Sequence, residues 1–126
     1  GWPRRYGRFR MVESLMLQAL APIFEGRVYP DAAAGDTPMP FATFQQVGGA
    51  STVFLDGALP DKQNARMQIT VWAKGRAQAS ELIAKVQAAL CGAPNFGLPQ
   101  GAPVSLRDQE TGFKGAMQDF SIWYTP

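Results

Sequence analysis

The sequence contains no histidine and only one cysteine among its 126 residues. Without histidine, the chain lacks the commonest general base and the commonest metal ligand of proteins. A single cysteine excludes an internal disulfide and a cysteine-based structural zinc site, and it fits a reducing compartment such as a cytoplasm. We interpret Cys91, at the end of a predicted helix, as a small packing residue because no histidine can activate its thiol.

Several other features of enzymes and membrane proteins are missing. No apolar run approaches the roughly 20 residues that a membrane-spanning helix needs. Neither a P-loop nor a GxGxxG motif after a strand is present, so no nucleotide cofactor is indicated. Asp108 or Glu110 could form an acidic pair with Asp119. Ten acidic residues scattered along the chain make this a weak signal for catalysis or metal binding. The sequence therefore predicts a protein that is not an enzyme and uses no cofactor, with a carboxylate-dependent hydrolase as a weaker alternative.

The first ten residues, GWPRRYGRFR, are basic and aromatic. The net charge of +2 depends on them, because 12 basic residues minus these 4 arginines leaves 8, against 10 acidic residues. Met11 follows at once, and we expect residues 1–11 to be a disordered extension or misplaced start outside the folded domain. The alternative is a nucleic-acid-binding arm, because arginines neutralise phosphates and aromatic rings stack on bases. Its contacts would be Arg4, Arg5, Arg8 and Arg10.

The spacing of apolar residues predicts two helices and several strands. Residues 12–24 and 76–90 follow a helical period. Pro22 lies inside the first of these patterns, so we expect either a broken last turn or a helix that stops near Leu20. Strands are predicted at 27–30, 41–49, 51–57, 65–74, 104–110 and 116–124, with a hairpin formed by the second and third of these. Residues 12–126 are therefore expected to form one α+β domain. It would have an antiparallel sheet of about four to five strands with both helices on its more apolar face.

Two tryptophans lie in the mainly polar rows of predicted strands. Trp72 alternates with Arg66, Gln68 and Thr70, and Trp123 alternates with Asp119. Burying an indole is worth roughly 2–3 kcal/mol, so we expect both rings to be covered. The cover would be either the proline-rich loop at residues 92–103 or a neighbouring subunit. In the second case the interface would include Trp72, Trp123, Arg66, Gln68 and Asp119.

Three blocks of the sequence resemble one protein family. They are GRVYPDAAAGDTPMPFATFQQVGG, ARMQITVWAKGRAQASELIAKVQAAL and RDQETGFKGAMQDFSIWY. Together they are similar to the tail completion (tail terminator) proteins of long-tailed bacteriophages, over residues 12–125 and with the elements in the same order. The corresponding segments are Gly26–Pro30, Phe41–Val47, Gln68–Ala73, Arg76–Leu90 and Gln118–Trp123. The basic arm lies outside this resemblance.

The resemblance implies a structural protein of the virion. Such proteins form a ring, usually hexameric, that caps the head-proximal end of the tail tube, stops tube polymerisation and presents a surface for head–tail joining. The implied partners are further copies of the chain, which can be monomeric in solution, the tail tube protein and the head completion or connector protein. DNA would pass through the lumen without specific binding, which suits a mildly acidic body. The protein would be made in the host cytoplasm and end up in the virion tail.

Deleting residues 1–10 separates the two hypotheses. For an assembly protein, we expect neither the full chain nor the shortened chain to bind duplex DNA in a titration over a range of salt concentrations. If the arm is a nucleic-acid contact, the full chain will bind with a steep salt dependence that the deletion removes, because each neutralised phosphate releases counterions.

Overall fold

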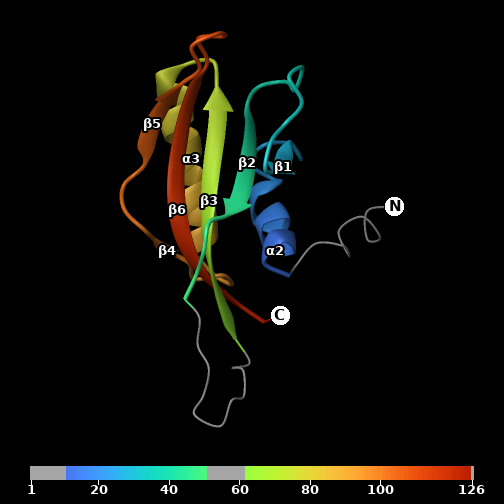
Figure 1. Ribbon diagram of the computed structural model, residues 1–126, viewed down its shortest axis with the longest axis vertical. Coiled ribbons are helices and arrows are strands. Elements are labelled where there is room, and N and C mark those ends of the chain that lie inside the picture. Colours follow the sequence, from blue (N-terminus) through green and yellow to red (C-terminus); the bar gives the residue numbers. More distant parts are fainter. Residues whose placement is uncertain (1–10, 51–61, 126) are drawn as a thin grey trace, which may run out of the picture.

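A computed structural model describes residues 11–50 and 62–125 of the protein (Figure 1). The first ten residues of the predicted extension and the predicted strand at 51–57 lie outside the described residues. The described elements, in chain order, are α2 (Met11–Leu20), β1 (Val28–Pro30), β2 (Phe41–Gln46), β3 (Gln63–Ala73), α3 (Arg76–Cys91), β4 (Leu98–Pro99), β5 (Val104–Arg107) and β6 (Lys114–Tyr124).

The predicted α+β class is confirmed, with a sheet that is slightly larger than expected. Its strand order is β1-β2-β3-β6-β4, and β5 pairs with β6 beside β4, which makes six strands. All pairs are antiparallel except β1–β2, in which Val28 lies opposite Ala42 in a parallel ladder. The sixth strand arises because residues 98 and 99, expected to be loop, pair with Ser121 and Phe120.

The helices follow the sequence patterns closely. The first helix ends at Leu20, two residues before Pro22, which is the shorter of the two ends expected for the 12–24 pattern. The second runs from Arg76 to Cys91 and ends at Gly92, whose N–H donates to the carbonyl of Ala88. Both helices pack against one face of the sheet, where α3 covers β3 and β6 (Figure 1). The buried row of β3 on that face is Ala65, Met67, Ile69, Val71 and Ala73.

One predicted strand is longer than the observed one, and the partner of one predicted hairpin lies outside the described residues. β2 pairs along its whole length with β3, whereas the expected hairpin partner, residues 51–57, lies outside the described residues. The strand expected at 104–110 ends at Arg107, because Asp108 starts a tight turn instead. One carboxylate oxygen of Asp108 accepts the Thr111 hydroxyl at 2.8 Å, and the other accepts the Glu110 backbone N–H at 3.1 Å. Asp108 and Glu110 therefore do not share a strand face.

One arginine joins the helix layer to the edge of the sheet. Arg76 is the first residue of α3, and its guanidinium donates to the carbonyl of Gly115 in β6 and to that of Leu106 in β5, both at 2.6 Å. Hydrogen bonds from a charged donor are stronger than those between neutral groups. This partly buried side chain therefore fixes α3 against β5 and β6 together.

The Asp108 turn predicts a specific pH dependence of stability. Hydrogen bonding by the Thr111 hydroxyl, and then by the Glu110 N–H, lowers the pKa of the Asp108 carboxyl below its ordinary value of 3.8. The stabilisation is therefore fully present above that value and lost as the pH falls through the folded pKa. Asp108→Ala should lower the melting temperature at neutral pH, and the difference from the parent should shrink in acid.

Glu110→Ala is the matched control, because it also removes one negative charge from the exposed turn. It should have little effect at any pH. Thermal unfolding followed by circular dichroism measures both variants. An Asp108→Ala difference that is unchanged well below pH 3.8 would contradict a role for the ionised carboxylate.

Candidate interaction surface

The two polar rows that hold tryptophan lie on the same face of the sheet. In antiparallel pairs, residues directly opposite each other share a face, and the β3–β6 register places Gln68 opposite Asp119 and Trp72 opposite Gly115. We call this surface, on the side away from the helices, the mixed face. It comprises Phe41, Thr43 and Gln45 of β2, Asn64, Arg66, Gln68, Thr70 and Trp72 of β3, Gly115, Met117, Asp119, Ser121 and Trp123 of β6, and, through their pairing with β6, Leu98 of β4 and Val104 of β5.

An ion pair lies near the middle of the mixed face. Nε of Arg66 is 2.7 Å from a carboxylate oxygen of Asp119, its diagonal neighbour across the β3–β6 ladder. The side chain of Arg66 is 48% exposed, whereas that of Asp119 is 16% exposed. Such a solvated pair contributes only about 0–1 kcal/mol to folding. Its exposed cation is more informative as a charged group that a partner would meet.

Trp72 is covered in part by the protomer's own sheet. It lies opposite Gly115 on one side and Phe41 on the other. A Cβ atom added to Gly115 would lie 3.0 Å from two carbons of the Trp72 ring, so the indole rests directly on the glycine backbone. Part of the cover of the Trp72 ring is therefore the backbone of the neighbouring strand β6, a possibility that the sequence analysis did not include. The residue that permits this contact, Gly115, lies next to the strand predicted at 116–124 and not inside it.

Trp123 differs from Trp72 because half of its surface, 50%, is exposed. The proline-rich segment does not bury it. Instead that segment adds Leu98, which is 60% exposed and lies opposite Ser121, while Val104 of β5, 51% exposed, lies opposite Met117. Large apolar side chains from three adjacent strands thus reach solvent on the mixed face. Sequence reasoning missed Leu98 because strand alternation cannot be seen in a two-residue strand.

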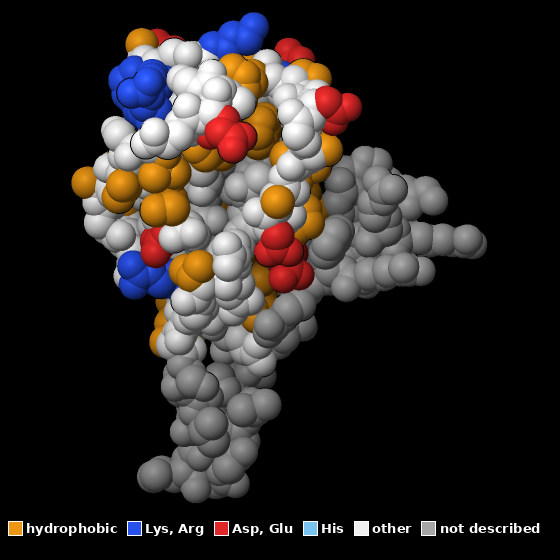
Figure 2. All heavy atoms as spheres, turned by 45° about the horizontal axis from the view of Figure 1, so that its top comes forward, with side chains coloured by type: hydrophobic (Ala, Val, Ile, Leu, Met, Phe, Trp, Pro, Cys, Tyr) orange, Lys and Arg blue, Asp and Glu red, His pale blue; other side chains and the backbone are white. Residues whose placement is uncertain are grey.

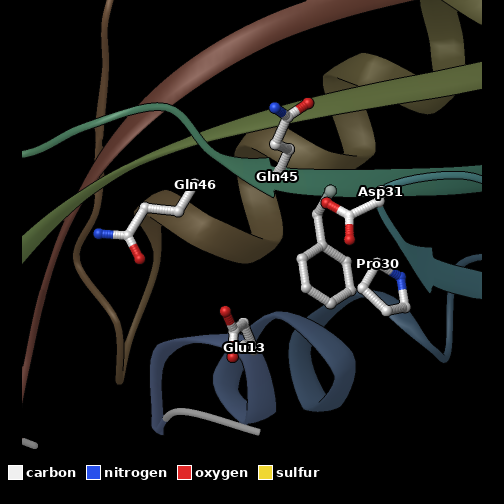
Figure 3. Close-up of a pocket in the computed structure, with 6 residues that line it drawn as sticks. Glu13, Pro30, Asp31, Gln45 and Gln46 are labelled. Carbon is white, nitrogen blue, oxygen red and sulfur yellow. The ribbon is translucent and has the colours of Figure 1, made fainter.

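A separate hollow lies between α2 and the ends of β1 and β2. Its volume is about 240 Å³, and it is lined by Glu13, Pro30, Asp31, Phe44, Gln45 and Gln46. Figure 3 shows Glu13 on α2 across the hollow from Asp31, which follows β1, while Gln45 points away from Glu13. The lining holds two carboxylates and two amides, and it contains no hydroxyl, thiol or basic side chain.

The remaining reactive groups also fail to form a catalytic site. In residues 11–50 and 62–125, no three acidic or cysteine side chains lie together in a way that would hold a metal ion. Burial raises the pKa of the Cys91 thiol, which keeps it protonated and poorly nucleophilic. Asp119 is paired with Arg66, and Asp108 is engaged in its turn, so the acidic pair considered from the sequence does not form. None of the described helices has the length and apolarity needed to span a membrane.

The mixed face has the features of a surface that binds other proteins, and the comparison with known proteins indicates the same kind of role. Residues 13–125 match the model of the tail completion protein gp17 family. The chain therefore belongs to the tail completion protein gp17 family, and it is a structural component of a phage virion rather than an enzyme. This family membership confirms the resemblance that the three sequence blocks indicated.

A solved structure shares the fold. A chain in the virion of native gene transfer agent (GTA) particle is similar to this protein, with a TM-score of 0.62 over 90% of this chain and 91% of that chain. At 21% identity, this similarity concerns the fold. No curated protein matches the sequence.

The contact between Trp72 and Gly115 can be tested by filling the space. Gly115→Val should lower the free energy of unfolding by about 1–3 kcal/mol, because the added atoms push the indole off the sheet. Gly35→Val is the control, since a Cβ at Gly35 meets nothing within 4 Å. Urea unfolding monitored by tryptophan fluorescence measures both. Equal stability of the two variants would show that the indole does not depend on the glycine.

Proposed function

We propose that this protein is the terminator of the phage tail. In this proposal, copies of the chain assemble into a ring at the head-proximal end of the tail tube, stop its polymerisation and offer the surface to which the head connector joins. The observation that carries the proposal is the exposure of Trp123, Leu98 and Val104 on the mixed face of a virion protein. Tail completion is a matter of binding, and this surface has the composition of a binding surface.

The physical argument concerns the kind of side chain that is exposed. Tryptophan and arginine are the residues most often found at the energetic centres of protein interfaces. On the mixed face, Trp123 and Arg66 lie on neighbouring strands, and apolar residues flank them. Grouped apolar side chains on a soluble surface commonly mark a contact with another protein. Gln68 and Asp119 supply polar groups that can fix the orientation of a partner.

Passage of DNA through such a ring requires a surface that does not hold phosphate. Outside the first ten residues the chain has 8 basic and 10 acidic side chains, since 12 minus 4 is 8, so the body is mildly acidic. Figure 2 shows that acidic and basic side chains alternate over the end that holds the β3–α3 and β5–β6 connections, with no single basic field. This distribution favours the passage of DNA over its binding.

The alternative function, a nucleic-acid-binding module, depends on the arginine-rich arm alone. Arg4, Arg5, Arg8 and Arg10 lie outside the described residues, and the family match begins at residue 13. The arm is therefore the one feature of the chain that the assembly function does not account for. Deletion of residues 1–10 followed by a DNA-binding titration tests the arm without any assumption about ring assembly.

Replacement of Trp123 tests the proposed function. Trp123→Ala should weaken each contact by about 2 kcal/mol or more, roughly 30-fold in affinity, because the exposed indole would be an anchor. It should cost little folding stability because half of the ring is already in solvent. Tails made with this variant should be overlong and poorly joined to heads when measured by electron microscopy.

Trp72→Ala and Gln109→Ala are the controls. The first should lower the melting temperature more than Trp123→Ala does, because the Trp72 ring packs on Gly115. The second changes an exposed residue of the β5–β6 turn and should leave both stability and tails unchanged. Tails of normal length that join heads in the absence of the whole protein would refute the terminator function itself.

A further inference from the structure

The protomer has two layers and leaves one side of its sheet bare. The helices α2 and α3 cover one face, and no described helix or strand lies over the mixed face (Figure 1). In α/β architectures with helices on both sides, a second helical layer fills this position. Among the described residues, this chain has no such layer of its own. The exposed indole of Trp123 and its apolar neighbours lie where that layer would pack.

Ring assembly places a requirement on whatever covers the mixed face. A ring is built from head-to-tail contacts, so each copy needs two different patches that complement each other. Contact of one mixed face with another would be isologous and would close at two copies. If the mixed face is one of these two patches, it meets a different surface of the next copy. The surface directly opposite it across the protomer is the outer side of α3.

The outer side of α3 carries short side chains and charges of both signs that can meet those of the mixed face. Its exposed residues include Ala84 and Ala88, whose short side chains leave room for an indole to approach the helix. Among the described residues, none of the large exposed apolar side chains belongs to α3. Glu81 and Lys85, four residues apart, lie on the same exposed side. Each surface thus carries one cation and one anion, so Arg66 and Asp119 can be matched by Glu81 and Lys85.

We propose that the mixed face of one copy docks on the outer side of α3 of the next copy. The inference rests on the proposed ring function and adds the orientation of the protomers within the ring. Repetition of this contact gives alternating sheets and helices around the ring. Each helix α3 then has an apolar partner on both sides, its own core on one and the Trp123 region of its neighbour on the other.

Cysteine cross-linking in assembled tails tests this orientation. In a Cys91→Ala background, Ser121→Cys places a thiol on the mixed face and Ala84→Cys places one on the outer side of α3. The double variant should give a ladder of disulfide-linked oligomers on a non-reducing gel, whereas each single variant should stay monomeric. Ser121→Cys combined with Gln18→Cys is the matched control, because Gln18 is exposed on α2. Circular dichroism checks that all variants fold.

Each outcome separates orientation from function. A ladder confined to the Ser121→Cys and Ala84→Cys pair supports the proposal. A dimer from Ser121→Cys alone, or a ladder with Gln18→Cys instead, overturns it. So does the absence of any cross-link in tails of normal length, and in that case the terminator function still stands. A different result would refute the terminator function, namely tails of normal length that form when the protein is absent.

Discussion

The pairing of β3 with β6 is the interaction on which the rest of the structure depends. The two strands run antiparallel over eleven pairs, from Gln63 opposite Tyr124 to Ala73 opposite Lys114. This ladder sorts side chains into two sets. Mainly apolar residues face the helices, together with the buried Gln118, whereas Arg66, Asp119 and the indoles face away. A shift of one residue would exchange the two sets and place charges in the core. The same register that builds the core therefore builds the binding surface.

Much of the fold could be predicted because it follows periodic patterns. The helix at 76–91 and the long strands show clear periods of 3.6 and 2, and Pro22 marks the end of the first helix. Short elements were less accessible. β4 has two residues, too few for any period, and the turn at Asp108 depends on a side chain that accepts two hydrogen bonds. The pairing of β2 with β3 is a long-range choice that local sequence does not encode.

The candidate site was predictable in composition but not in detail. Alternation alone placed Trp72 and Trp123 among polar neighbours, and the register confirms that both rows share one face. It did not reveal that the two indoles have different surroundings. Trp72 lies on a glycine, whereas Trp123 is half exposed and lies two residues along β6 from Ser121, which pairs with Leu98 of β4. Those contacts come from strands far apart in the chain, so only the folded sheet brings them together.

Arg76 gives the protomer a mechanical property that follows from its two carbonyl partners. Its guanidinium holds β5 and β6 from the first residue of α3, so displacement of the helix must move the edge strand that bears Val104. The helix layer and the edge of the sheet are thus linked by one side chain. Movement of α3 away from the sheet would have to break two hydrogen bonds from a charged donor, which favours movement of the helix and the edge strand as one unit.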